Sequence, residues 1–242
     1  MRSKSLSLIL PVYDDKSQIE KVIGDIRRKF KDLGLDDYEL LIFLDSRVTP
    51  LTKQILDNLS GKDMAGRVKV FDGEAHQKIG TIFAEGVKNS RKDFVGIYSA
   101  YDQINVESFD HIVPKLGKKD IVVCYVKNPD ARPCHRAAFS KLNVLLLNLI
   151  FGLDLKYYHL CFFRTGLANK IGIKSRGHSA MSEVLIRMLK SEASFIQVPF
   201  TMVPHSFSSR SGAFDLSNLI ECVLTYLILF FDIRLLGKRI NL

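Results

Sequence analysis

Three short apolar runs in this chain each end abruptly in polar or acidic residues. The runs are Leu6 to Leu10, Leu40 to Leu44 and Phe94 to Tyr98. Continuous rather than alternating apolar runs are typical of strands that are buried on both faces of a parallel sheet. Open sheets of this kind bind ligands just beyond the carboxyl ends of their strands. The pattern therefore predicts a crevice at one sheet edge. The carboxylates that follow the runs are Asp14, Asp15, Asp45 and Asp102.

Between and after these runs, apolar positions repeat at helical spacing. Residues 19–33 predict an amphipathic helix, with a capping box at Ser17 to Glu20, and a second helix begins at Thr49-Pro50 and ends at Gly61. Further strands are predicted at Val68 to Phe71, Ile121 to Val126 and Phe195 to Thr201, and further helices at Gly80 to Asn89, Glu107 to Leu116 and Ser179 to Lys190. This alternation predicts an α/β, Rossmann-like fold, a mostly parallel sheet flanked by helices.

Two segments are more apolar than the rest: Leu142 to Leu153, and Leu219 to Phe231. Both are shorter than the roughly 20 apolar residues that a membrane-spanning helix needs. We interpret the first as a buried core helix. For the second, which precedes Arg234, Lys238 and Arg239, a buried helix and a helix lying among the headgroups of an anionic leaflet fit equally. We expect one domain over residues 1–215 and a C-terminal amphipathic helix over residues 216–242.

Composition narrows the class of partner. Lys and Arg number 35 against 26 Asp and Glu, a formal net charge of +9 that favours phosphates, nucleic acid or an acidic membrane. No nucleic-acid stacking module is present, so we expect no nucleic acid partner. The four cysteines lack C-x-x-C spacing, which indicates reduced thiols. The first strand begins too early for a signal peptide, so we predict a cytoplasmic protein.

The strand-end motifs resemble those of the family-two glycosyltransferases with the GT-A fold, in particular the dolichyl-phosphate mannose synthase-like group. Pro11-Val12-Tyr13-Asp14-Asp15 resembles the family's Pro-x-Tyr-Asn-Glu turn, which holds the nucleotide base, and Asp45-Ser46 resembles its Asp-Asp-Ser turn. The resemblance implies a nucleotide-binding site formed by Pro11, Tyr13, Asp15, Asp45, Gly80 and Ser99.

The second half of the chain is similar to the same group. The segment from Arg136 to Ser140 resembles the Arg and Ser that contact the acceptor lipid phosphate, which implies an acceptor site at Arg132, Arg136 and Ser140. Arg210-Ser211-Gly212 approximates the basic loop that closes over the diphosphate. The local sequence at Glu183 resembles that of the family, and a catalytic role and a structural role fit this residue equally. The predicted catalytic residues are Asp102, Arg136, Arg164, Glu183 and Arg210.

One departure from the family pattern concerns the metal. Where the family reads Asp-x-Asp, this chain has Ser99-Ala100-Tyr101, followed by Asp102-Gln103. Two alternatives remain for stabilising the leaving diphosphate. Asp102, with Gln103 and the nearby Asp45, would form a weak Mg²⁺ or Mn²⁺ site. Alternatively, the charge is neutralised without metal by arginine forks and other cations, namely Arg210, Arg164, His205 and Lys78.

The resemblance implies that an oxygen of a polyprenyl phosphate, dolichyl or undecaprenyl, attacks the anomeric carbon of a nucleotide sugar with inversion. Such a phosphate is already ionised and needs positioning more than a general base. The hypothesis is a glycosyltransferase held peripherally at the cytoplasmic face of a membrane, in cell-envelope glycan biosynthesis. One alternative is a catalytically inactive relative that serves as a binding or scaffold protein in that pathway. Another is a soluble transferase with a sugar or protein acceptor.

Overall fold

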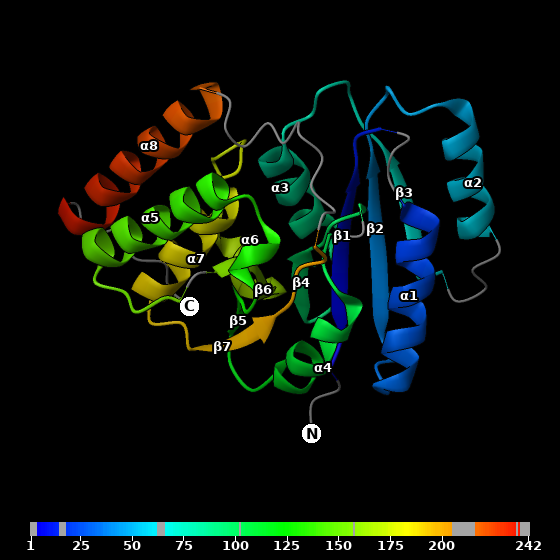
Figure 1. Cartoon of the computed structure of the whole chain (residues 1–242), viewed down its shortest axis with the longest axis horizontal. Helices are drawn as coiled ribbons and strands as arrows, with labels where there is room; N and C mark the ends of the chain where they lie inside the picture. Colours follow the sequence, from blue (N-terminus) through cyan, green and yellow to red (C-terminus); the bar gives the residue numbers. More distant parts are fainter. Residues whose placement is uncertain are drawn as a thin grey trace.

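A seven-stranded sheet forms the centre of the described protein, with strand order β3-β2-β1-β4-β6-β5-β7 (Figure 1). The computed structural model describes residues 4–14, 18–61, 66–101, 103–156, 158–204, 216–235 and 237. The strands are β1 (Leu6–Val12), β2 (Tyr38–Leu44), β3 (Val68–Asp72), β4 (Phe94–Ile97), β5 (Ile121–Val126), β6 (Tyr158–Arg164) and β7 (Phe195–Phe200). The helices are α1 (Ile19–Asp32), α2 (Pro50–Gly61), α3 (Ile79–Asn89), α4 (Phe109–Ile112), α5 (Cys134–Phe151), α6 (Thr165–Ile171), α7 (Ala180–Lys190) and α8 (Leu216–Phe230).

The strand directions bring the predicted site residues to one edge. Strand β1 pairs in parallel with β2 and β4, with Val12 opposite Leu44 and Ile9 opposite Ile97. Strand β6 is antiparallel to both of its neighbours, and β5 and β7 run parallel to each other. The carboxyl ends of all the described strands except β6 therefore lie at the same edge. The predicted mostly parallel α/β sheet is confirmed.

Two apolar layers hold helices against the two faces of the sheet. On one face, α1, α2 and α4 pack against the sheet, and the rings of Phe30 and Phe109 meet edge to face with centroids 4.9 Å apart. On the other face, α3, α6 and α7 contribute Phe83, Ile171 and Met188. Strands covered on both faces must be apolar throughout, which is why the runs in β1 and β2 do not alternate.

Helices α5 and α8 lie together outside α7, on the left in Figure 1. Leu147 and Phe151 of α5 pack with Ile186 of α7 and Leu229 of α8. The opposite face of α5 is exposed, and Leu149 is 70% accessible. The prediction of a core helix is therefore wrong for the outer half of α5. Within the described ranges, none of the helices combines the length and the hydropathy that crossing a membrane requires.

Two further expectations need correction or fall outside the description. The helix predicted over Glu107 to Leu116 is broken into a 3-10 turn (Val106–Ser108), α4 and a second 3-10 turn (Val113–Lys115). Pro114 is the physical reason why α4 ends at Ile112, because it has no backbone N–H to continue an α-helix. Ser17 of the predicted capping box lies outside the described residues. Helix α6 was not expected from the apolar pattern.

Candidate active site

Backbone hydrogen bonds join the ends of the central strands at the carboxyl edge. The N–H of Asp45 donates to the carbonyl of Val12 at 2.9 Å, which fixes the turn after β2 against the end of β1. The N–H of Gly73 donates to the carbonyl of Leu44 at 2.7 Å, which adds the segment after β3. The loops after these neighbouring strands are thus held close together, as the apolar runs predicted.

Tyr101 ties the loop after β4 to the end of β1. Its hydroxyl oxygen accepts hydrogen bonds from the backbone N–H groups of Tyr13 at 3.0 Å and Asp14 at 3.2 Å. The N–H of Tyr101 itself donates to the hydroxyl of Ser99 at 3.2 Å. Burial and the nearby charge of Asp14 raise the pKa of Tyr101 to about 12, so the phenol stays neutral at physiological pH. A neutral side chain therefore stands at the position that the sequence resemblance assigns to the second Asp-x-Asp carboxylate.

The end of β1 provides Pro11 and Tyr13, both predicted to bind the nucleotide. Pro11 is buried within the strand, and the Tyr13 side chain packs partly buried against the α3 side of the core. Burial raises the pKa of Tyr13, and the negative charge of Asp45 raises it further. Tyr13 is thus an uncharged aromatic surface next to Asp45, and a planar base can stack on such a surface.

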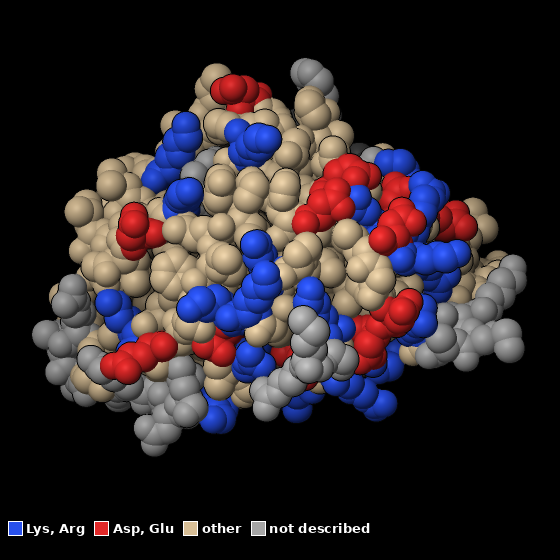
Figure 2. Space-filling model, turned by 90° about the horizontal axis from the view of Figure 1, so that it is seen from below, with Lys and Arg blue, Asp and Glu red and all other residues tan. Residues whose placement is uncertain are grey.

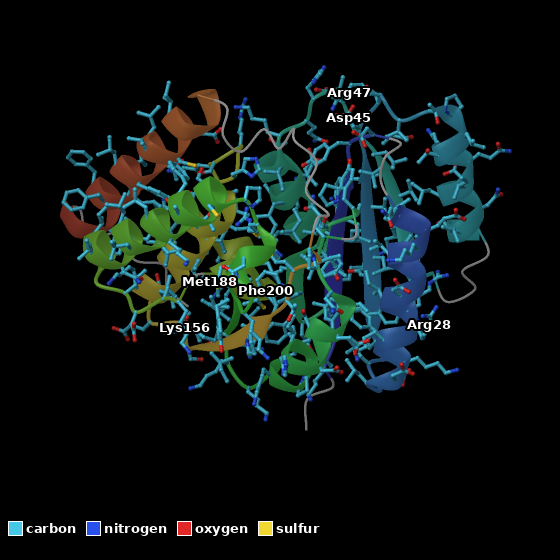
Figure 3. All side chains as sticks on the ribbon, viewed as in Figure 1. Arg28, Asp45, Arg47, Lys156, Met188 and Phe200 are labelled. Atoms are coloured by element: carbon cyan, nitrogen blue, oxygen red, sulfur yellow. The ribbon has the colours of Figure 1, made fainter. Side chains whose placement is uncertain are left out.

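Asp45 and Arg47 form a closely bonded pair in the turn after β2 (Figure 3). The guanidinium of Arg47 donates from Nε to Oδ1 at 2.7 Å and from Nη2 to Oδ2 at 2.9 Å. Oδ1 also accepts the N–H of Arg47, and Oδ2 accepts that of His76. Burial alone would raise the pKa of Asp45, but the hydrogen bonds from Arg47 and His76 outweigh it and lower the pKa below its ordinary value. Asp45 is an ionised, buried anchor for Arg47.

Gly80 lies where α3 contacts the 174–177 segment. A Cβ at this position would meet the backbone carbonyl carbon of Arg176 at 2.4 Å, so a side chain has no room. The same segment is bound by α8, because Oε1 of Glu221 accepts the N–H groups of Arg176 and Gly177. Lys78, at the start of α3, donates to Oε2 of Glu221 at 3.2 Å. Gly80 therefore allows a close approach of backbone segments near the carboxyl end of β3.

Hydrogen bonds extend from the loop after β4 to the predicted acceptor residues. The carbonyl of Gln103 accepts the N–H of Val203 at 3.0 Å. Met202 exchanges two hydrogen bonds with the side chain of Asn128, just after β5. Four residues after Asn128, the chain reaches Arg132, whose Nη1 donates to the Ser140 hydroxyl at 3.5 Å. The structure thus brings Arg132 and Ser140 together at the start of α5. Arg136 lies in the same helix, and its side chain is not described.

Two predicted catalytic residues are engaged in structural contacts. Arg164 ends the antiparallel strand β6 and pairs with Phe94, the first residue of β4, so it lies at the opposite edge of the sheet. There it binds Asp120 at 3.0 Å. Glu183 is 2% exposed, and its carboxylate accepts the N–H groups of Lys174 and Ser175 and a bond from Arg187. The predicted role of Arg164 is therefore wrong, and the hydrogen bonds of Glu183 to Lys174 and Ser175 agree with the structural alternative.

The described donors do not by themselves form a metal site. Asp15, Asp102, His205 and Arg210 lie outside the described residues. Within the described part, no group of three or more His, Cys, Asp or Glu side chains converges as a metal site would require. Both carboxylate oxygens of Asp45 are taken by Arg47 and His76. Gln103 supplies a neutral oxygen that accepts a bond from the Ser99 hydroxyl at 3.4 Å.

Sequence reasoning missed Arg47. The sequence offered one indication: Arg47 comes two residues after Asp45 at the end of a strand. At that spacing an Asp side chain accepts a hydrogen bond from the backbone N–H of the later residue. The role of Tyr101 in joining two loops was also missed, because the sequence shows only that a tyrosine replaces the expected carboxylate at this position.

A surface pocket of about 440 Å³ lies at the amino edge of the sheet, away from these residues. Figure 2 views the molecule from this side and shows Lys and Arg interspersed with Asp and Glu. Lining residues pair with one another, since Lys69 binds Glu39 and Lys92 binds Asp37. We assign no function to this pocket.

Comparison with known proteins agrees with the fold described above. The family model described as glycosyl transferase family 2 matches residues 7–166. No curated protein sequence matches the chain. Among solved structures, glucosyl-3-phosphoglycerate synthase from Mycobacterium tuberculosis with Mg²⁺ and UDP matches with a TM-score of 0.63 at 14% identity, covering 93% of this chain and 79% of that chain. Its complex with Mn²⁺, UDP-glucose and phosphoglyceric acid matches with a TM-score of 0.63 at 16% identity, covering 92% and 79%.

The fold and the family match define a transferase domain of the GT-A class. The chain belongs to glycosyl transferase family 2, and it is a glycosyltransferase. The similar synthase was crystallised with Mg²⁺ or Mn²⁺ and UDP.

Proposed function

We propose that the protein transfers a sugar from a nucleotide sugar to a polyprenyl phosphate, with inversion, at the cytoplasmic face of a membrane. The observation that carries the acceptor assignment is that Arg132 and Ser140 lie at the start of α5, a helix whose outer face is apolar and exposed. A guanidinium and a hydroxyl suit a phosphate, and the apolar surface suits a prenyl chain.

Helix α8 supports a membrane surface as partner, because its inward face carries polar groups beside the buried Leu229, whereas its outward face is apolar. Thr225 is buried and lies within hydrogen-bond distance of the hydroxyls of Ser175 and Ser179. Asp232, just beyond the helix, binds Arg187 of α7. The opposite stripe is exposed: Ile220, Val223, Leu224, Leu227, Ile228 and Phe231. A helix surrounded by water has the reverse arrangement, so α8 favours an apolar partner.

Together with α5, this stripe forms what we name the α5–α8 surface. Its α5 members are Phe139, Leu142, Leu145, Leu146 and Leu149. Lys141 lies among them, and Arg234, Lys238 and Arg239 follow α8 in the sequence. Apolar bulk beside basic residues fits an anionic lipid surface, in which leucines enter the headgroup region while cations meet the phosphates. The occupant we propose is therefore an anionic membrane.

The residues at the carboxyl edge perform the binding steps of this reaction. Tyr13 offers its aromatic surface to the base, and Tyr101 holds the loops after β1 and β4 in place. Arg132 and Ser140 orient the acceptor phosphate, which attacks the anomeric carbon as an oxyanion, while the nucleoside diphosphate departs. No general base is needed, since the nucleophile is ionised at neutral pH. A bound divalent metal would supply positive charge to the leaving diphosphate.

The test is transfer itself. The protein is incubated with UDP- or GDP-sugars, Mg²⁺ or Mn²⁺, and undecaprenyl or dolichyl phosphate in phospholipid vesicles, and lipid-linked sugar is extracted and measured. We expect a lipid-linked product, and we expect Arg132→Ala to raise KM for the acceptor more than it lowers affinity for the nucleotide. Arg28→Ala is the matched control, because Arg28 is an exposed arginine of α1 that pairs with Asp25. Transfer to phosphoglyceric acid but not to any polyprenyl phosphate would overturn the acceptor assignment. Nucleotide binding without transfer would support a binding or scaffold protein instead.

A further inference from the structure

Arg47 places a fixed cation at the edge where the nucleotide is proposed to bind. Its side chain is 45% exposed, whereas the Asp45 side chain that holds it is 1% exposed. Nε and Nη2 bind Asp45, and the N–H groups of Nη1 take no part in any hydrogen bond within the described part of the chain. Arg47 is also close enough to Asp14 and Tyr101 to interact with them electrostatically. It therefore lies where the segments after β1, β2 and β4 meet.

We infer that Arg47 binds the diphosphate of the nucleotide sugar and stabilises its negative charge as it leaves. This inference rests on the proposed nucleotide-sugar site. A guanidinium suits the role because it is planar, donates in pairs to phosphate oxygens and never loses its proton. The buried carboxylate fixes the plane of the guanidinium before the ligand arrives, so less side-chain freedom is lost on binding.

The other described cations considered for this role are engaged elsewhere. Arg164 lies at the opposite edge of the sheet and binds Asp120. Lys78 binds Glu221 of α8. At the position of the second Asp-x-Asp carboxylate, Tyr101 brings a neutral phenol instead of a metal ligand. A protein cation at this edge compensates for that loss of metal-binding charge.

A rival interpretation uses the same contacts. If the Asp45–Arg47 pair fills the space that the nucleotide needs, Arg47 is a plug, and its removal will improve binding. The two interpretations predict opposite effects of one substitution, so a binding measurement separates them.

The experiment compares UDP and GDP with uridine and guanosine by isothermal titration, with EDTA and then with Mn²⁺. We expect the intact protein to prefer a nucleoside diphosphate over its nucleoside in EDTA. Arg47→Ala reduces diphosphate affinity about tenfold or more and leaves nucleoside affinity unchanged, because a charged hydrogen-bond donor is lost. Arg47→Lys falls between, since an ammonium cannot donate as a fork. Arg28→Ala is the control, because Arg28 is an exposed arginine of α1 paired with Asp25, distant from this edge in Figure 3.

Two results would overturn the inference while leaving the proposed function intact. One is Arg47→Ala binding the diphosphate as tightly as, or more tightly than, the intact protein. The other is a diphosphate preference that appears only with Mn²⁺ and is the same in Arg47→Ala. Arg47→Gln guards against misfolding, since its shorter side chain keeps an N–H donor for Asp45 but not the charge. If the intact protein binds no nucleotide and no nucleoside, the proposed function itself fails together with the inference.

Discussion

The hydroxyl oxygen of Tyr101 accepts the backbone N–H of Tyr13 at 3.0 Å, across a sequence separation of 88 residues. This bond, with the adjacent one from Asp14, joins the loops after β4 and β1 through a neutral side chain. Tyr101, at the position that the sequence resemblance assigns to the second Asp-x-Asp carboxylate, is a structural clamp. Its removal should therefore affect stability and site geometry together.

Tyr101→Phe should lower the free energy of unfolding by about 1–2 kcal/mol, because two backbone N–H groups lose their acceptor. The measurement is urea denaturation at neutral pH. Tyr125→Phe is the control, since no hydrogen bond of the Tyr125 hydroxyl is found in the described part of the chain, and its ring still contacts Lys156. Equal stability of Tyr101→Phe and the intact protein would contradict the clamp.

Asp45→Asn should destabilise the protein at neutral pH, by an amount that shrinks in acid. The pKa of Asp45 is lowered in the folded state, so its ionised form contributes stability above the unfolded value of about 3.9. That contribution is lost as the pH falls through the folded pKa. At pH 7 we expect a loss of about 1.5 kcal/mol, the lower end for charged hydrogen bonds, because Arg47 is nearly half exposed. Urea titrations at stepped pH test this, and a difference that is independent of pH would count against it.

The sequence predicted the sheet and the convergence of its strand ends because both follow from local patterns. Runs such as Leu40 to Leu44 are apolar throughout, and that pattern specifies burial on two faces. The same reasoning failed for α5, because an apolar stripe facing the core and one facing outward have the same composition. Only tertiary packing separates Leu147, which is buried, from Leu149, which is 70% exposed.

The site was predicted less completely, since side-chain pairing is not periodic. Arg164 was expected at the site on the basis of charge, but an antiparallel β6 carries it to the other edge. No local sequence pattern predicts that β6 runs antiparallel to its neighbours. Arg47 was missed because its role depends on Asp45 being buried, which the sequence does not state. Asp15, Asp102 and Arg210 stay predictions.

Gly80→Ala should destabilise the protein by about 1–3 kcal/mol, because the added methyl would overlap the backbone of Arg176 and Gly177. The displaced 174–177 segment should also loosen its bonds to Glu221. The control is Gly24→Ala in α1, where the structure leaves open space and the better helix propensity should add about 0.5–1 kcal/mol. Thermal unfolding of both variants tests the pair, and a Gly80→Ala protein as stable as Gly24→Ala would refute the close approach.

Leu149→Asn should weaken binding to vesicles of equal parts phosphatidylglycerol and phosphatidylcholine about tenfold. Leu149 is 70% exposed on the α5–α8 surface, and transferring one leucine from water into lipid contributes roughly 1.5 kcal/mol. Leu51→Asn is the matched control, because Leu51 is 66% exposed on α2, at the other end of the molecule in Figure 1. Co-sedimentation measures both, with circular dichroism to check helix content. If the two variants lose binding equally, or neither does, the α5–α8 surface does not contact the bilayer. A loss confined to Leu149→Asn, together with weaker binding of the intact protein to pure phosphatidylcholine, identifies an anionic membrane as its partner.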